Sequence, residues 1–448
     1  IHDTLNQVFG LQDFRPHQQE IIERLIDGGD AFVLMPTGGG KSLCYQLPAL
    51  HRPGLAIVVS PLISLMKDQV DALRANGVRA AMYNSNLNAG EAREVLEALH
   101  SGELDLLYVA PERMMRPGFL HSLESMQVAL IAIDEAHCVS QWGHDFRPEY
   151  VALGELREQF PGTPFIALTA TADPQTREDI VGVLRLQDAQ RFVTSFDRPN
   201  IRYTVLEKHQ PQAQLIRFLN EREEESGIVY ALSRKRTEEV ADHLADRGFS
   251  AAAYHAGLNA DVRRDVQERF LRDEVSIVVA TVAFGMGIDK PNVRFVVHYD
   301  MPRHLEGYYQ ETGRAGRDGL SSEALLLFGT QDAAMARYQI EQGRNEEQKR
   351  VELHKLNAMV GFGESQSCRR RVLLGYLGES LEQDCGNCDV CLDPPERFDG
   401  TEAARKVLSC VYRVGQSFGM KHVVDVLRGA DNEGIRKFGH EHLSTYGI

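Results

Sequence analysis

The chain of 448 residues has no long apolar run, only one tryptophan and only seven cysteines. A membrane-spanning helix needs about 20 consecutive apolar residues, and no run of even 18 occurs, so we expect no membrane partner. No secretory pattern opens the sequence, which begins at Ile1 rather than at a methionine, so a few residues are expected to precede it. With 43% hydrophobic and 25% charged residues, the composition is that of a globular protein.

Cysteine is also too clustered for a disulfide framework, because three of the seven lie within seven residues. Such clustering points to metal binding in a reducing compartment, so we expect a cytoplasmic protein. Basic residues are in deficit: the net charge of −15 argues against a protein that coats nucleic acid nonspecifically. From residue 401 to the end, however, seven Lys and Arg stand against five Asp and Glu, and a local balance of this kind still permits phosphate contacts.

Two parts of the sequence repeat one pattern, in which a buried β-branched run is followed by a polar loop. The expected strands lie at 31–35, 55–60, 104–110, 128–134 and 165–172, then at 226–233, 251–257, 275–281, 293–300 and 323–328. Amphipathic helices closed by glycine are expected between them, as at 62–77 and 235–248. Strands buried on both faces that alternate with helices predict an α/β fold with two doubly wound parallel sheets.

The pattern changes after about residue 333. A long helix is expected at 344–362, the cysteine cluster follows, and 391–400 has the proline and glycine content of a linker. The last 48 residues predict three short helices. We expect domains at 1–197, 198–332, 333–398 and 399–448.

A glycine-rich loop, "MPTGGGKS" at 35–42, stands between an expected strand and an expected helix. Its backbone N–H groups suit a polyphosphate, Lys41 would reach the terminal phosphates, and the Ser42 hydroxyl would hold Mg²⁺. Met35 replaces the usual first glycine, and the alternative is a glycine-rich turn beside a surface lysine. The expected nucleotide-binding residues of this loop are Thr37, Gly38, Gly39, Gly40, Lys41 and Ser42.

Two adjacent acidic residues stand at the end of the strand expected at 128–134: Asp134 is its last residue and Glu135 follows it. Asp134 suits the coordination of Mg²⁺, and Glu135 is placed to polarise a water against the γ-phosphate. Taken alone, such a pair is more often a helix cap.

Two arginines, Arg314 and Arg317, lie in "QETGRAGRDG" at 310–319 of the second sheet's sequence. A guanidinium from a neighbouring domain can stabilise charge on a transferring phosphoryl group. In isolation, a solvated surface pair is the simpler interpretation.

The cysteine cluster has the spacing of a four-thiolate metal site. Cys368 is followed after sixteen residues by Cys385, Cys388 and Cys391, and such a set fits both tetrahedral Zn²⁺ and an iron–sulfur cluster. The run "CRRR" at 368–371 adds basic charge that would face DNA or form a solvated helix face.

These motifs, in this order, resemble the RecQ family of superfamily 2 DNA helicases, especially its bacterial members. The resemblance runs from Leu5 to the last residue. The segments that carry it are "FGLQDFRPHQ" (9–18), "MPTGGGKS", "SPLISLMKDQ" (60–69), "DEAHC" (134–138), "LTATA" (168–172), "YHAGL" (254–258), "ATVAFGMGIDKP" (280–291) and "QETGRAGRDG".

The resemblance implies two RecA-like domains, ATP-driven movement 3′ to 5′ along DNA, and roles in recombination and repair. It implies that Arg15 and Gln18 read adenine, with Phe14 as a stacking candidate. Gln310 would join Arg314 and Arg317 in completing the ATP site. The resemblance does not indicate which of the two is the arginine finger, the arginine that stabilises charge on the transferring phosphoryl group. It favours structural Zn²⁺ over iron–sulfur, and "TAT" at 169–171 would couple nucleotide state to the grip on DNA.

The aromatic segment after the acidic pair resembles the family's loop that senses single-stranded DNA. Stacking and phosphate contacts are expected from Gln141, Trp142, His144, Phe146 and Arg147. Alternatively, the rings of Trp142 and Phe146 fill a core. DNA that orders this loop would reposition Glu135, which lies only a few residues earlier in the chain.

The last segment resembles the start of a winged-helix domain, but the sequence ends before a β-hairpin wing. The implied partners are single-stranded and partly duplex DNA and a single-stranded-DNA-binding protein, and a monomer is expected. Two other functions are weighed, an RNA helicase and a DNA-binding scaffold with a dead ATPase. "DEAH" rather than "DEAD", the cysteine cluster and the aromatic segment count against the first, and the competent residues at every catalytic position count against the second.

Overall fold

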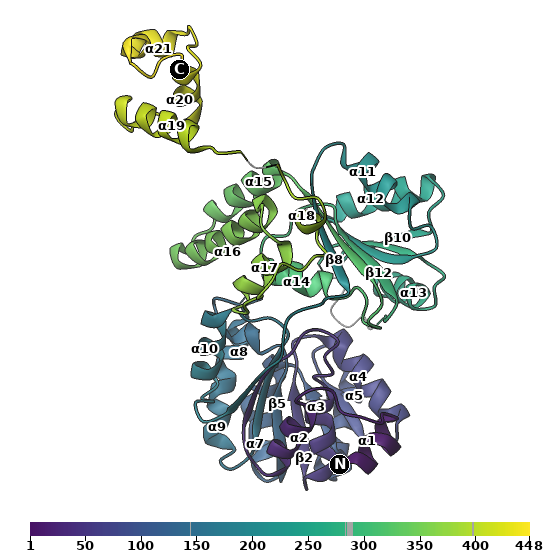
Figure 1. The fold of residues 1–448 in the computed structure, drawn as a ribbon. Coiled ribbons are helices and arrows are strands. Elements are labelled where there is room, and N and C mark those ends of the chain that lie inside the picture. Colours follow the sequence, from purple (N-terminus) through teal and green to yellow (C-terminus); the bar gives the residue numbers. More distant parts are fainter. Residues whose placement is uncertain (144, 283, 285–289, 397) are drawn as a thin grey trace. The chain divides into compact units, whose positions relative to one another are not determined.

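The computed structural model describes residues 1–143, 145–282, 284, 290–396 and 398–448 (Figure 1). The chain divides into two units, unit 1 over Ile1–Asp393 and unit 2 over Pro394–Ile448. Unit 1 contains two parallel sheets and a helical module that carries the clustered cysteines, and unit 2 is helical. Among the helices of the described residues, none is both long and apolar enough to cross a membrane.

The first sheet has seven strands in the order β3-β4-β2-β5-β6-β1-β7, all paired in parallel. Its strands are β1 Ala31–Leu34, β2 Leu55–Val59, β3 Ala80–Tyr83, β4 Leu106–Val109, β5 Val128–Ile133, β6 Phe165–Thr169 and β7 Gln190–Val193. Its helices are α1 His2–Phe9, α2 Gln18–Ile26, α3 Leu43–His51, α4 Ile63–Ala75, α5 Ala89–His100, α6 Pro111–Met114, α7 Pro117–Glu124, α8 Pro148–Val151, α9 Leu156–Gln159 and α10 Pro174–Val183, with short 3₁₀ turns η1 Ala136–Val139 and η2 Ala152–Glu155.

Strand residues of this sheet alternate between two hydrophobic cores, because successive side chains of a strand point to opposite faces. In β1, Ala31 and Val33 join the core formed with α2, α3 and α4, whereas Phe32 and Leu34 join the core formed with α5, α7 and α10. Burial on both faces explains why these strands read as continuous apolar runs. The sheet therefore lies between two helical layers (Figure 1).

The second sheet has six parallel strands in the order β10-β11-β9-β12-β13-β8. Its strands are β8 Ile201–Glu207, β9 Ser226–Tyr230, β10 Ala251–Tyr254, β11 Ile277–Ala280, β12 Val293–His298 and β13 Ser322–Phe328. The accompanying helices are α11 Pro211–Asn220, α12 Arg234–Asp246, α13 Ala260–Leu271 and α14 Leu305–Thr312. Helices α11 and α12 cover one face, where they bury residues such as Leu219 and Leu244.

The helical module packs on the second sheet and contains α15 Thr330–Glu341, α16 Glu346–Glu364, α17 Arg369–Tyr376 and α18 Asp389–Leu392. Helix α16 begins at a capped terminus, where the Asn345 side chain accepts hydrogen bonds from two backbone N–H groups of the first turn. The module reaches edge strand β8 directly, through a parallel bridge between Tyr203 and Cys388. The Asp389 carboxylate accepts a hydrogen bond from the Val205 N–H at 2.9 Å.

Unit 2 contains α19 Thr401–Arg413, α20 Met420–Leu427, α21 Glu433–Phe438 and the 3₁₀ turn η3 His440–His442. Its own small core consists of Cys410, Val414, Val423, Val426 and Ile435. The three short helices expected at the end of the sequence are confirmed.

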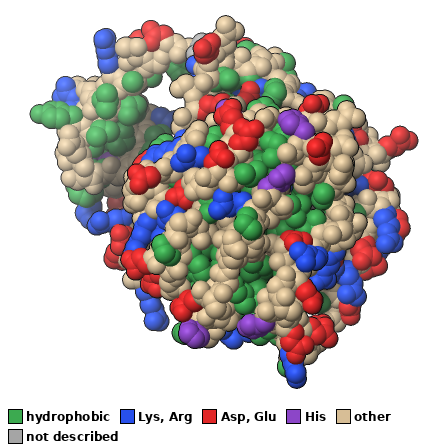
Figure 2. Space-filling view, turned by 90° about the horizontal axis from the view of Figure 1, so that it is seen from below, with side chains coloured by type: hydrophobic (Ala, Val, Ile, Leu, Met, Phe, Trp, Pro, Cys, Tyr) green, Lys and Arg blue, Asp and Glu red, His purple; other side chains and the backbone are tan. Residues whose placement is uncertain are grey.

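All ten strands expected from the sequence are present, but three others were missed. These three, β3, β7 and β8, all lie at sheet edges. The expected linker at 391–400 is partly wrong, because its first two residues belong to α18. On the face of the molecule that Figure 2 shows, acidic and basic side chains are interspersed rather than separated by sign.

Candidate active site and metal centre

The glycine-rich loop joins β1 to α3 at the carboxyl edge of the first sheet. Gly38 and Gly40 have φ angles of 80° and 82°, which side chains other than glycine rarely adopt. Lys41 folds back over the loop, and its Nζ donates to the backbone oxygens of Met35 at 3.1 Å and Pro36 at 3.2 Å. Burial lowers the pKa of Lys41, and the nearby acidic pair partly offsets that effect.

Two residues of the N-terminal motif brace this loop. Arg15 donates from Nη1 to the Gly38 oxygen, and Gln18 donates from Nε2 to the Gly40 oxygen at 3.0 Å. The Gln18 Oε1 accepts from the Arg15 N–H at 2.8 Å, so both ends of this amide are engaged within the protein. The two side chains therefore contact the backbone of the glycine-rich loop, and their expected contact with adenine stays a prediction.

Phe14 lies farther from the loop. Its ring meets His2 edge-on with centroids 5.1 Å apart, and it packs beside a small core that includes Leu5 and Leu43. Stacking on a base requires an accessible ring, and Phe14 is half-buried.

The acidic pair lies at the end of β5, beside the glycine-rich loop. Asp134 is 8% exposed, and Glu135 has φ 48° and ψ 45°, an uncommon left-handed conformation for a side chain other than glycine. Burial and the adjacent charge of Glu135 raise the pKa of Asp134 to about 7. The pair does not cap a helix through its side chains, so the capping alternative is not supported.

His137, which the sequence analysis did not single out, orients Glu135. Its Nδ1 lies 3.2 Å from Glu135 Oε2 and 2.8 Å from Thr169 Oγ1. Burial alone would raise the pKa of Glu135, but the hydrogen bond and charge of His137 outweigh it and lower the pKa. For His137 itself, burial is opposed by contacts with Cys138 and Glu135, which raise its pKa to about 10. An ionised carboxylate is thus held in place beside the loop.

A chain of hydrogen bonds leads from this histidine to the second sheet. Thr169 Oγ1 donates to the Thr171 oxygen at 3.1 Å, and the Thr171 hydroxyl accepts from Gln310 Nε2 at 3.2 Å. Residues 169–171 therefore connect the catalytic candidate Glu135 with α14. This geometry is compatible with the coupling role expected for "TAT", which stays a prediction.

Both arginines of 310–319 reach the same site from the second sheet. The charge of Arg314, which is 7% exposed, helps lower the pKa of Glu135. Arg317 lies over the glycine-rich loop: its Cγ is 3.5 Å from the position a Cβ would take on Gly38. The interpretation as a solvated surface pair is wrong for Arg314, because it is buried.

The first part of the aromatic segment, residues 140–143, turns tightly after η1. Ser140 Oγ donates to Asp179 at 2.7 Å and accepts from the Trp142 N–H at 3.0 Å. Gly143 is needed because a Cβ there would overlap the backbone oxygen of His137. These contacts fix the backbone that leads from η1 to Trp142.

The expected DNA-contacting residues differ in accessibility. Gln141 is exposed, whereas Trp142, Phe146 and Arg147 are half-buried. Arg147 pairs with Asp145 at 2.8 Å and donates to a backbone oxygen of the first sheet's loops, so its contact with a phosphate would require exchange of partners. Neither ring is among the residues of the hydrophobic cores in the described part of the chain, and His144 lies outside the described residues.

Trp142 instead meets the helical module. Its ring lies edge-on to His354 of α16, with centroids 6.5 Å apart and an interplanar angle of 82°.

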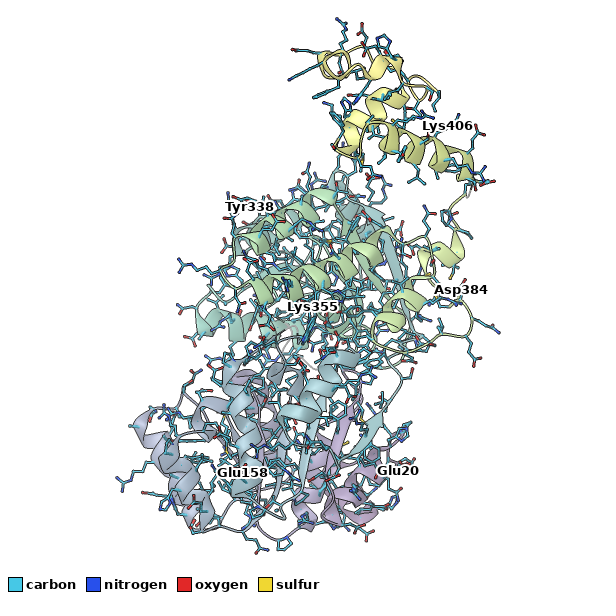
Figure 3. The ribbon with its side chains drawn as sticks, turned by 90° about the vertical axis from the view of Figure 1, so that its left-hand side faces the viewer. Glu20, Glu158, Tyr338, Lys355, Asp384 and Lys406 are labelled. Carbon is cyan, nitrogen blue, oxygen red and sulfur yellow. The ribbon has the colours of Figure 1, made fainter. Side chains whose placement is uncertain are left out.

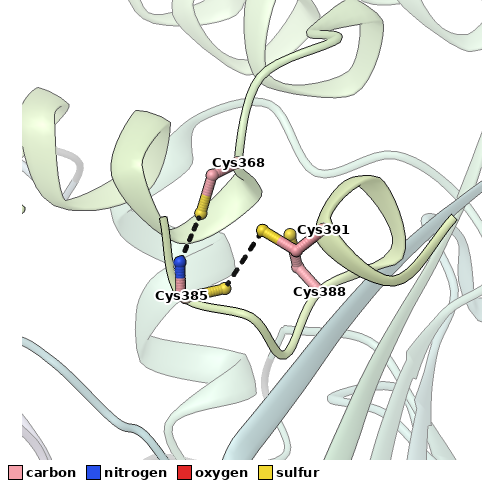
Figure 4. A group of neighbouring side chains, drawn as sticks. All are labelled: Cys368, Cys385, Cys388 and Cys391. Carbon is pink, nitrogen blue, oxygen red and sulfur yellow. Dashed lines mark hydrogen bonds between the residues drawn. The ribbon is translucent and has the colours of Figure 1, made fainter. Parts of the chain in front are cut away.

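The four cysteines of the module converge on one point (Figure 4). Their sulfur atoms all lie within 4.8 Å of one another, and the Cys385 and Cys391 sulfurs are 3.9 Å apart. A tetrahedral ion with metal–sulfur bonds of about 2.3 Å requires sulfur–sulfur edges of about 3.8 Å. Backbone N–H groups of Cys385 and Arg369 point at the sulfurs of Cys368 and Cys388, at 3.3 and 3.4 Å, which favours thiolates. The donor set therefore fits Zn²⁺.

Both interpretations of "CRRR" are wrong for its first two arginines. Arg369 and Arg370 are 7% and 4% exposed and face the protein. Arg369 pairs with Asp389 at 3.0 Å, and Arg370 donates to the Ile201 oxygen at 2.8 Å. They fix the module to the second sheet, and only Arg371 is exposed.

The chain matches four family descriptions in sequence order. "DEAD/DEAH box helicase" matches residues 15–180, "Helicase conserved C-terminal domain" 210–319, "RecQ zinc-binding" 330–392 and "RQC domain" 394–448.

Relatives match over nearly the whole chain. An "ATP-dependent DNA helicase RecQ" from Pasteurella multocida is 53% identical, with 100% of this chain and 71% of the relative covered. The protein of the same name from Bacillus subtilis is 44% identical, with 99% and 76% covered. The solved structure of Mss116p bound to single-stranded RNA shares the fold at a TM-score of 0.61 and 16% identity, with 83% of this chain and 87% of that chain covered. These matches, together with the geometry of the candidate site, show that the chain belongs to the RecQ family of ATP-dependent DNA helicases.

Proposed function

We propose that this protein hydrolyses ATP to move 3′ to 5′ along single-stranded DNA and to unwind duplex DNA, in recombination and repair. The observation that carries the proposal is the meeting of Lys41, Glu135 and the two motif arginines at one edge of the first sheet. The family relatives named as DNA helicases support the choice of DNA as partner. The polarity rests on the family resemblance.

The residues have distinct parts in hydrolysis. Lys41 binds the terminal phosphates, and Ser42 and Asp134 would hold Mg²⁺, which neutralises phosphate charge when bound. Glu135 accepts the proton of the attacking water, for which its low pKa keeps it ionised. Because Arg314 and Arg317 come from the second sheet, hydrolysis would depend on the relative position of the two sheets.

The aromatic segment is the proposed DNA sensor. Gln141, Trp142 and Phe146 would contact single-stranded DNA, and its binding would act on Glu135 through the short connection between them. His144 and Arg147 are proposed as phosphate contacts.

Other features are proposed on the family resemblance. These are cytoplasmic location, function as a monomer, contact with a single-stranded-DNA-binding protein, and domain boundaries at 197, 332 and 398.

The test is the ATPase rate with and without a single-stranded DNA oligonucleotide, with RNA of the same sequence as the comparison. We expect stimulation of at least tenfold by DNA and little by RNA. Lys41→Ala should reduce hydrolysis by 100-fold or more while retaining DNA binding. The control is Arg93→Ala, which removes an exposed pair with Glu97 on α5. Equal stimulation by RNA would favour an RNA helicase, and no hydrolysis under any condition would refute the proposal.

A further inference from the structure

A buried cation interrupts the apolar face of α16. Lys355, labelled in Figure 3, is 4% exposed, and Val351, Met359 and Phe362 of the same helix are buried as well. Its Nζ is 2.8 Å from Oε1 of Glu306, whose side chain is 2% exposed. Replacing a buried ion pair by packed apolar residues is often neutral or stabilising. Stability alone therefore does not account for a charge at this place.

The partner of Lys355 belongs to the helix that leads to the motif arginines. Glu306 lies in the first turn of α14, Gln310 lies one turn later, and Arg314 and Arg317 follow the end of the helix. The Tyr308 ring of α14 also packs on a ring of α16, Phe362, with centroids 5.1 Å apart. Helix α16 thus holds α14 at two points.

The residue before Lys355 touches the proposed DNA sensor. His354 meets Trp142 edge-on, as described above, and no residue separates it from Lys355 in the chain. One turn of α16 therefore contacts both the aromatic segment of the first sheet and α14, the helix that precedes the two arginines. This connection is separate from the hydrogen bonds that run through Thr169 and Thr171.

We propose that Lys355 is a positioning residue for hydrolysis. Through Glu306 it fixes the segment that carries Arg314 and Arg317. Through the neighbouring His354, the position of this segment responds to DNA bound at Trp142. The proposal rests on the proposed function and adds a route by which DNA regulates the ATP site. Coupling between the two sites is a free energy that variants can measure directly.

The first test compares Lys355→Met, Lys355→Arg and Glu306→Gln with the unaltered protein in ATPase titrations with a poly-dT oligonucleotide. For Lys355→Met we expect a tenfold or greater fall in DNA-stimulated kcat, with the KM for ATP and the Kd for DNA changed less than threefold. Lys355→Arg, which keeps the charge, should retain at least half of the stimulation. Combining Lys355→Met with Glu306→Gln should cost no more than either change alone. The control is Lys349→Met, on the same helix but paired with a mostly exposed carboxylate, Glu346.

The second test uses the fluorescence of Trp142, the only tryptophan of the chain. With His354→Ala we expect the change on adding the oligonucleotide to persist while the stimulation of hydrolysis falls about fivefold. Trp142→Ala should add little to that loss. Wild-type stimulation in Lys355→Met would overturn the proposal, as would a kcat that falls only in proportion to the folded fraction. Absence of stimulation in the unaltered protein would instead refute the proposed function, so the two failures are distinguishable.

Discussion

At the scale of single residues, a buried charged side chain connects several elements of the second sheet. Asp300, after β12, has a side chain only 3% exposed and accepts from Lys208 at 2.7 Å and from Arg236 at 2.8 Å. It also accepts from the backbone N–H of Leu232 at 2.9 Å. One carboxylate therefore joins residues that follow β8 and β9 and a residue of α12. Removing one member of such a group leaves the others buried without their partner, which is costly.

Asp300→Asn is expected to destabilise the protein by roughly 3 kcal/mol at neutral pH. Burial alone would raise the pKa of Asp300. The hydrogen bonds from Lys208 and the Leu232 N–H, with the charges of Lys208 and Arg236, outweigh burial and hold the pKa below the ordinary value of 3.8. A carboxyl with a lowered pKa stabilises the fold above its unfolded pKa, and this stabilisation is lost as the pH falls through the folded value. The difference between the two proteins should therefore shrink below about pH 4. Urea unfolding at pH 7.5 and at pH 3.5 measures it.

The matched control is Glu97→Gln, which breaks an exposed pair on α5 and should cost less than about 1 kcal/mol at either pH. A cost for Asp300→Asn that is equally large at pH 3.5 would contradict the electrostatic explanation.

At the scale of elements, the cysteine module is a small unit held by its metal ligands and by buried arginines. Helices α17 and α18 have only eight and four residues, too few to be stable alone. Their attachment to β8 runs through Arg369, Asp389 and the Tyr203–Cys388 bridge. The order of this module should depend on a bound metal ion.

Removal of the metal is expected to lower the thermal midpoint of unit 1 by roughly 5–10 °C. A chelator that competes for Zn²⁺ should have this effect, because without the ion the four thiolates repel one another or become protonated. Cys388→Ala, which removes one of the four ligands, should act in the same direction. Elemental analysis should give one zinc per chain before treatment and none after. Cys410→Ala, in the core of unit 2, serves as the control and should leave the zinc content unchanged. An iron signal with visible absorbance would contradict the zinc assignment.

At the scale of the whole molecule, the two units differ in charge and join through an exposed segment. Unit 2 from residue 401 onward carries the slight basic excess noted above, although the whole chain is acidic. Phe398, in the joining segment, is 84% exposed. Such a segment is a preferred site for proteolysis.

Limited proteolysis is expected to cut within 394–400 and to release a fragment of unit 1 that keeps its DNA-stimulated ATPase rate within about twofold. The proposed ATP site and the aromatic segment lie entirely in unit 1, which supports this expectation. Affinity for duplex DNA should fall by about tenfold in moderate salt, since basic residues are lost with unit 2. ATPase and duplex-binding assays on the cut and uncut protein measure both, and parallel loss of hydrolysis on cutting would contradict the division of roles.

The sequence predicted those parts of the molecule that depend on contiguous residues. The buried strands were predictable because burial on both faces gives an unbroken apolar run. Edge strands β7 and β8 were not, because much of their length is exposed; in β7 only Phe192 is buried. Strand β3 was missed although three of its four residues are buried. The glycine-rich loop and the cysteine cluster were also predictable, because their residues lie close together in the sequence.

Features that depend on tertiary packing were not predictable. Nothing local distinguishes buried Arg369 and Arg370 from solvated arginines, or Lys355 from other lysines of a long charged helix. His137 stood within a motif that was quoted, but its contact with Thr169 joins residues 32 positions apart. Such contacts exist only once the sheet has brought distant segments together.

The bridge between Tyr203 and Cys388 has a consequence for solubility. β8 ends the second sheet, and an open strand edge offers unpaired backbone groups to any other extended chain. The metal-ligating segment covers part of this edge with its own backbone and with the Asp389 carboxylate. When zinc is scarce, the edge of β8 would therefore be open, and the sheets of different molecules could pair edge to edge. The protein would then be lost to aggregation before its catalytic activity was lost.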